Sequence, residues 1–181
     1  MKRENLQRLS LSAMFVAVGY ILPLFTGQIP EIGNMLLPMH LPVFLCGLIC
    51  GWRYGLAVGA ILPLTRSLFF GMPVIFPNAV GMAAELATYG LVVGLLYALS
   101  RHKCIISLYR ALILAMLAGR AVWGVTMVLL LGFSGSAFGW AAFAAGAFTN
   151  AIPGICLQLV IIPAVMLLLK RAKIPTLKGK K

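Results

Sequence analysis

The chain has 181 residues, which is short for two domains, so we expect a single domain over residues 1–181. Apolar residues make up 62% of it and charged residues only 10%, a balance that excludes an ordinary soluble domain and predicts an integral membrane protein. The formal net charge of +12 would favour a nucleic-acid partner in a soluble protein, but its distribution along this chain indicates a membrane topology and no nucleic acid.

Six mostly apolar segments follow one another along the chain, and none shows the alternating pattern of a strand. We therefore predict an all-α fold, a bundle of six transmembrane helices in the lipid bilayer. The predicted spans are roughly 9–25, 36–50, 54–70, 79–99, 109–131 and 144–169. The first segment follows basic residues as a signal peptide does, but no A-x-A-like cleavage site comes after it, so we expect it to remain as the first helix.

The positive charges lie on one side of this predicted topology. Thirteen of the fifteen Lys and Arg stand before the first span, after the second, between the fourth span and the first turn of the fifth, or after the sixth. The three loops on the other side, 26–35, 71–78 and 132–143, contain none. Because loops rich in Lys and Arg stay in the cytoplasm, we predict a multi-pass protein of the cell membrane with both termini cytoplasmic, N-in/C-in.

Small residues at four-residue spacing indicate where the predicted helices approach one another closely, since lipid gives helices no hydrophobic reason to associate. One set straddles the turn "GWRYG" and predicts a close antiparallel hairpin of the second and third spans: Gly47, Gly51, Gly55 and Gly59. Ala13 and Ala17 form a small-residue notch near the cytoplasmic end of the first span. This notch fits either an internal neighbour or another protein.

Three ionisable residues lie inside predicted spans: Arg66 in the third, Glu85 in the fourth and Arg120 in the fifth. A charged residue at the middle of the bilayer costs about 2.5–3.5 kcal/mol, so each of these residues suggests a function. Helix geometry, with a rise of about 1.5 Å per residue, places all three between the outer surface and the midplane.

Neutral polar and aromatic residues gather at the same depth: Tyr89, Trp123, Asn150, Asn78 and His40. Tyr89 lies one helical turn from Glu85, on the same face. Trp123 lies one turn from Arg120, again on the same face. We expect Asn78 to cap the start of the fourth span. Together these residues predict a polar chamber for a small ligand, open to the outside and with flat aromatic walls.

Two interpretations of the buried charges are open. In the first, Glu85 forms a structural ion pair with Arg120 or with Arg66 and locks the helices together. Such a pair leaves one arginine over, because two arginines face one glutamate, and an unpaired buried arginine is costly. A bound anionic or strongly hydrogen-bonding ligand would compensate it.

No nucleotide-binding or catalytic motif appears, and the chain contains no Asp, so we expect neither enzymatic activity nor a cofactor. Cys46 and Cys50 are one helical turn apart, but no His or further Cys stands beside them, so we expect reduced thiols and no metal. A small membrane enzyme that uses His40 and Glu85 as acid–base groups is an alternative. A structural or sensory subunit with a purely packed core is another.

A six-helix bundle with an outward site and no energy source of its own resembles the substrate-binding (S) components of energy-coupling factor (ECF) vitamin transporters. The resemblance covers nearly the whole chain. The segment "AMFVA" at residues 13–17 matches the A-x-x-x-A notch in the first helix of this family. The block "LPMHLPVFLCGLICGWRYGLAVGAILPLTRSLFFGMP" looks like its helix-two-to-three region.

This resemblance implies high-affinity capture of a vitamin from outside the cell. It implies docking through the first helix, at Ala13 and Ala17, onto a transmembrane T component that is held by two ABC-type ATPases, which use the ATP. It also implies that helices four to six and the outer loops supply most ligand contacts. The residues here that match that location are Arg120, Trp123, Glu85, Tyr89 and Asn150. No substrate-specific motif of the family is matched, so the vitamin stays undetermined.

Overall fold

The computed structural model describes residues 2–25, 37–100, 104–133 and 151–171, and these residues form helices and contain no strand. The helices are α1 (Lys2–Phe25), α3 (His40–Ile49), α4 (Trp52–Phe70), the short π-helix η1 (Ile75–Ala79), α5 (Val80–Leu99), α6 (Ile105–Phe133) and α8 (Ile152–Arg171). The predicted all-α class is confirmed for this part of the chain.

Four stretches of helix are long and apolar enough to cross a membrane: Glu4–Leu24, Ile75–Leu99, Ile105–Gly132 and Ile152–Arg171. Helix α3 has only ten residues, whereas a span needs about twenty. It begins later than the predicted 36–50 because Leu37 has a φ of 49° and precedes Pro38, and neither position allows a regular helix to continue. Helix α4, with 19 residues, is not among the four, so the count of six spans stays a prediction.

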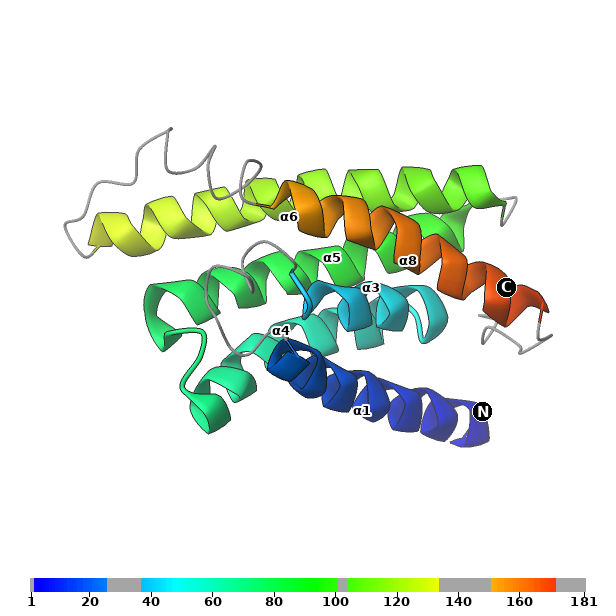
Figure 1. Ribbon diagram of the computed structural model, residues 1–181, viewed down its shortest axis with the longest axis horizontal. Helices are drawn as coiled ribbons and strands as arrows, with labels where there is room; N and C mark the ends of the chain where they lie inside the picture. The colour runs from blue at the N-terminus through cyan, green and yellow to red at the C-terminus, as the bar shows by residue number, and fades with distance from the viewer. Residues whose placement is uncertain (1, 26–36, 101–103, 134–150, 172–181) are drawn as a thin grey trace.

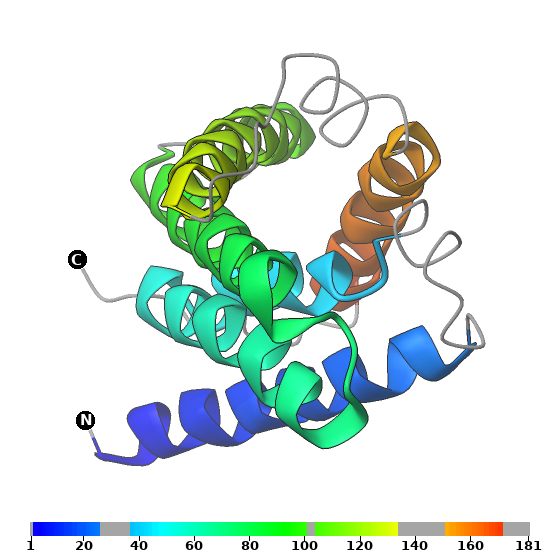
Figure 2. The same ribbon diagram turned by 90° about the vertical axis from the view of Figure 1, so that its left-hand side faces the viewer.

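The helices run roughly along the long axis of the molecule, and the start of α1 lies at the same end as the end of α8 (Figure 1). Helix α5 contacts α3, α4 and α6, whereas α1 contacts α3 and α4. Helix α8 contacts α6 and α3. Seen end-on, α1 and α6 therefore lie on opposite sides of the α4–α5 layer, with α8 set apart from α4 and α5 (Figure 2).

Glycines bring the backbones of α3, α4 and α5 into direct contact. A Cβ atom added at Gly90 would overlap the carbonyl group of Gly55, and one at Gly47 would lie 2.7 Å from the carbonyl oxygen of Gly90. A Cβ at Gly59 would likewise overlap the carbonyl of Leu86. The predicted close hairpin of the second and third spans is present as α3 and α4, but its glycines also face α5. We call Gly47, Gly55, Gly59 and Gly90 the glycine seam.

The hydrophobic core lies where α3, α5 and α6 meet, and α8 adds to it. Its fully buried members include Phe44, Leu86, Leu112 and Ile162, one from each of these four helices. The same cluster also takes in Phe15 of α1 and Leu62 of α4, so the core reaches across the glycine seam and holds the polar groups of α5 and α6 in the interior.

Helix α1 packs on the bundle through Ser12, Phe15 and Gly19, and Gly19 lies directly against the side chain of Leu62 in α4. Ala13 and Ala17 are on another face of α1 and are exposed. The small-residue notch therefore does not pack against an internal neighbour among the described helices, and it is available to lipid or to another protein.

Candidate functional site

A buried ion pair joins α5 to α6. The Arg120 Nη1 atom lies 2.9 Å from Oε1 of Glu85, and the two side chains are only 7% and 2% exposed. Of the two arginines that the sequence offered as partners for Glu85, the structure brings Arg120 to it. Both charges are removed from solvent, so each depends on the other for compensation.

Tyr89 and His40 complete the surroundings of Glu85. The Tyr89 hydroxyl, one helical turn along α5, donates a hydrogen bond of 2.6 Å to Glu85 Oε1. His40 Nε2, at the start of α3, lies 3.8 Å from the same oxygen, which is beyond hydrogen-bonding distance. A Cβ at Gly119 would overlap the Tyr89 ring, so α6 lacks a side chain where that ring lies. We call His40, Glu85, Tyr89 and Arg120 the Glu85 cluster.

Several buried polar atoms of this cluster have no hydrogen-bond partner among the described residues. They are Nε and Nη2 of Arg120 and both ring nitrogens of His40. Leaving a buried donor or acceptor unsatisfied costs about 1–3 kcal/mol, so native proteins rarely do so without a bound molecule or water at the site. The cluster therefore has hydrogen-bond donors available to a group outside the described residues.

Gln158 of α8 is a further buried polar residue, and the sequence analysis did not single it out. Its side chain is almost fully buried and its amide nitrogen has no partner among the described residues. The signal was present in the sequence, because Gly154, Gln158, Ile162 and Met166 recur every four residues and form the buried face of α8. A polar residue within such a stripe faces the interior of the bundle.

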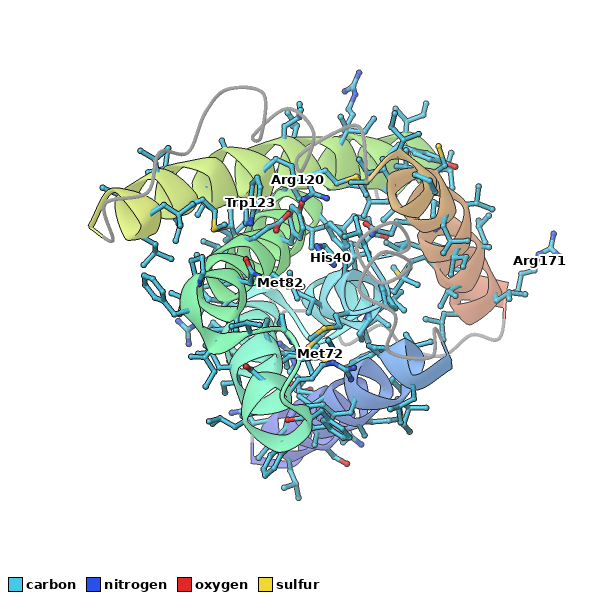
Figure 3. The ribbon with its side chains drawn as sticks, turned by 60° about the vertical axis from the view of Figure 1, so that its left-hand side comes forward. His40, Met72, Met82, Arg120, Trp123 and Arg171 are labelled. Carbon is cyan, nitrogen blue, oxygen red and sulfur yellow. The ribbon has the colours of Figure 1, made fainter. Side chains whose placement is uncertain are left out.

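Trp123 follows Arg120 by one turn on α6 and is half-buried. It lies beside α5, where a Cβ at Gly81 would be 3.5 Å from its indole ring. Figure 3 shows Arg120 and Trp123 on the side of α6 that faces the other helices, with His40 across from them at the start of α3. The figure thus places Arg120, Trp123 and His40 toward the interior of the bundle.

Arg66 faces away from the Glu85 cluster and toward α1. Its Nη1 donates a hydrogen bond of 3.0 Å to the carbonyl oxygen of Tyr20, and its guanidinium lies 5.3 Å from the centre of the Phe70 ring. Among the described residues, the charged groups near Glu85 are Arg120 and His40, and Arg66 is not one of them. The prediction that two arginines face one glutamate is therefore wrong for this site. Its two full charges, the Glu85 carboxylate and the Arg120 guanidinium, compensate each other.

The expected capping role of Asn78 is wrong. Asn78 is exposed, and Ala79, which precedes α5, makes no side-chain cap hydrogen bond. The π-helix η1 leads directly into α5, and the backbone N–H of Val80 reaches the carbonyls of Ile75 and Pro77. These bonds satisfy the start of α5 without a cap. Asn150 lies outside the described residues.

Comparison with known families assigns the chain. The family described as "ECF transporter, substrate-specific component" matches residues 7–166. The chain belongs to this family. A comparison with curated proteins finds no match. As a substrate-specific component, the protein captures substrate in the membrane as part of a transporter, and membership implies association with a transmembrane T component and ATPases.

For a substrate-specific component, the Glu85 cluster has the chemistry of a binding site. It offers hydrogen-bond donors at Arg120, a donor or acceptor at His40, and a neighbouring indole at Trp123. Within the described ranges, no group of three or more His, Cys, Asp or Glu side chains could hold a metal ion.

Proposed function

We propose that this substrate-specific component captures a vitamin or related small micronutrient from outside the cell and takes it up together with an ATP-driven energy-coupling module. The observation that carries the proposal is the pair of Arg120 donors that have no partner among the described residues, buried in the interior of an apolar bundle beside Glu85. A purely structural ion pair needs no such free donors, whereas a site for a small polar molecule does.

The proposed topology has six spans with both termini in the cytoplasm. Support comes from the one-sided distribution of Lys and Arg and from the start of α1 and the end of α8 lying at one end of the molecule (Figure 1). In this topology the loops without Lys or Arg face outside. Substrate then enters from the end of the bundle at which α5 begins and α6 ends.

The proposed ligand contacts are Arg120, Glu85, Tyr89 and His40 in the Glu85 cluster, with Trp123 as an apolar wall. Asn150 stays in the proposal on the strength of its place in the sequence. Exposed Asn78 can serve only at the outer entrance, because it lies before α5 rather than within the bundle. Arg66 is left out because its guanidinium is directed to Tyr20 and Phe70.

The proposed partners are a T component and two ABC-type ATPases, and ATP is used by those ATPases and not by this chain. The exposed Ala13 and Ala17 on α1 supply a docking face, since small residues allow another helix to approach closely in lipid. Docking there keeps the partner away from Glu85, Tyr89 and Arg120, because these stand on α5 and α6 whereas α1 packs against α3 and α4.

Retention of a small molecule by the purified protein tests this function. The full chain carrying an affinity tag is purified in mild detergent and denatured, and the released compounds are identified by mass spectrometry. We expect one compound in near-stoichiometric amount. Cells that express the chain with an energy-coupling module should accumulate an isotope-labelled form of it, and inactive ATPases should abolish the uptake. No retained compound together with no ATP-dependent uptake would favour a structural or sensory subunit.

A further inference from the structure

Arg120 contacts Glu85 through one end of its guanidinium group, and the edge formed by Nε and Nη2 is not used by that contact. Nη1 is engaged by Glu85 Oε1 at 2.9 Å, while Nε and Nη2 are buried and have no partner among the described residues. These two nitrogens lie on the same side of the planar group, and their N–H bonds point in parallel. Such a fork donates two hydrogen bonds at once to a pair of neighbouring acceptor atoms in one plane.

The charge of the site decides which kind of acceptor pair fits. Glu85 and Arg120 already compensate each other, and Arg66 lies against Tyr20 and Phe70. A carboxylate or phosphate on the free edge would add a second buried negative charge with no further cation among the described residues of the cluster, unless His40 took up a proton. Uncompensated buried charge is expensive, whereas an uncharged acceptor pair brings no such cost.

We propose that Arg120 receives an uncharged, planar group of the substrate that carries two adjacent hydrogen-bond acceptors, such as a ring carbonyl beside a ring nitrogen in a fused heterocycle. An arginine fork binds such a neutral pair when it reads O6 and N7 of guanine. The half-buried indole of Trp123, one turn along α6 on the same inward side (Figure 3), offers a flat surface for the same planar group. This inference rests on the proposed function, because it specifies the substrate of the same site.

The test uses the compound extracted from the purified wild-type chain as its probe. Its affinity is measured by equilibrium dialysis against four full-length variants: Glu85→Gln alone, Arg120→Lys and Arg120→Gln each combined with Glu85→Gln so that no buried carboxylate loses its cation, and, as the control, Arg53→Lys. Arg53 is exposed and lies over the Trp52 ring, outside the cluster, so its change tests for a general effect of replacing arginine by lysine. Elution volume and thermal unfolding without the compound report whether each variant is folded.

An uncharged acceptor pair predicts that, relative to Glu85→Gln alone, adding Arg120→Lys or Arg120→Gln weakens binding similarly, each by about tenfold or more, because both lose the fork. Glu85→Gln should not strengthen binding, since a neutral group gains nothing from an extra positive charge at the site, and Arg53→Lys should bind as wild type does. The inference is overturned if Arg120→Lys binds at least about tenfold more tightly than Arg120→Gln, or if Glu85→Gln binds more tightly than wild type. Either result means that the site recognises an anion by its charge.

The proposed function fails in a different way. If the wild-type chain retains no compound at all, the capture function and this inference fall together. If a compound is retained and transported but shows the pattern expected for an anion, capture stands and only the assignment of an uncharged group is wrong.

Discussion

Two arginines are buried in this bundle, and the structure gives them different surroundings. Arg66 is 3% exposed, donates a hydrogen bond to the backbone carbonyl of Tyr20 and lies against the Phe70 ring. Arg120 is also buried, pairs with Glu85 and keeps two nitrogens without a partner among the described residues. The first arrangement is complete as it stands and holds α4 to α1. The second leaves two donors for a group outside the described residues.

Alanine substitutions separate these two roles. Arg120→Ala should weaken binding of the copurified compound by more than about thirtyfold, or about 2 kcal/mol, because it removes charge-assisted donors from a desolvated site. Arg66→Ala should lower the thermal unfolding temperature equally with and without the compound and leave its affinity unchanged, since only the contact with Tyr20 and Phe70 is lost. Thermal unfolding in detergent and equilibrium dialysis measure the two effects. Equal destabilisation by both variants with unchanged affinity would reduce the Glu85 cluster to an ion-pair network.

Several residues of the site were predictable from the sequence alone. Glu85 and Arg120 are costly in a membrane wherever they stand, and the four-residue spacing of Glu85 and Tyr89 places both on one face of any helix. The direction of Arg66 was not predictable, because helical periodicity does not say which neighbouring helix a face meets. Gln158 was not predicted, because a neutral amide costs less free energy in lipid than a charged group and so indicates a site less strongly.

At the scale of helices, the contact between Tyr89 of α5 and Gly119 of α6 fixes how closely the two helices approach beside the Glu85 cluster. A methyl group at Gly119 would overlap the Tyr89 ring, so Gly119→Ala should destabilise the protein by about 1–3 kcal/mol and reduce retention of the compound. Gly132→Ala in the same helix is the matched control, because nothing lies within 4 Å of its added Cβ. Thermal unfolding and the retained amount of compound compare the two. Equal stability of the variants would mean that α5 and α6 can separate without loss.

The outward face of α1 permits a second test, of docking. Ala13→Trp or Ala17→Trp should abolish uptake while leaving retention of the compound intact, because a large side chain fills the notch on the surface and not in the Glu85 cluster. Ala164→Trp provides the same chemical change at an exposed position on α8 and should transport normally. Copurification of the ATPases with each variant reports docking directly. If a variant loses the compound while its complex with the ATPases still forms, the notch packs inside the bundle and does not dock a partner.

The extent of each helix was predicted less well than its presence. Helix α1 begins at Lys2 and not near residue 9, because hydropathy reports where a helix is apolar and not where it is hydrogen-bonded. Polar residues such as Glu4 and Gln7 continue the same helix. Helix α3 is shorter than its apolar stretch because backbone conformation at Leu37 and Pro38, and not hydropathy, determines its start. Sequence periodicity carries neither kind of information.

At the scale of the whole molecule, native Cys104 tests the orientation in the membrane. It is exposed just before α6, on the predicted cytoplasmic side. In a Cys156→Ser variant, a membrane-impermeant maleimide should label Cys104 only after the cells are permeabilised. With Cys104→Ser and Gly132→Cys added, labelling should occur on intact cells. The opposite pattern would invert the topology.

The same cysteine predicts a pH dependence of labelling. The backbone N–H of Ser107, and the contact of the thiol with the Ser107 hydroxyl oxygen 3.7 Å away, lower the pKa of the Cys104 thiol. The thiolate is the form that reacts, and a lowered pKa keeps it populated to lower pH. In permeabilised cells, labelling of Cys104 should therefore persist to a lower pH than labelling of N-acetylcysteine under the same conditions. A decline at the same pH or higher would show that these contacts are absent in the membrane.

Backbone contact along the glycine seam makes α3, α4 and α5 mechanically stiff as a unit. Side chains between helices can change rotamer and let the helices slide, but glycine backbones already in contact have nothing left to rearrange. Helices α6 and α8 lie outside this seam and meet the unit through side chains, including the Glu85–Arg120 bond. We therefore expect α6 and α8 to be the moving wall of the binding site and the seam to be its fixed wall. Arg120, on the moving wall, is then placed where closure around a captured molecule brings its free edge into contact.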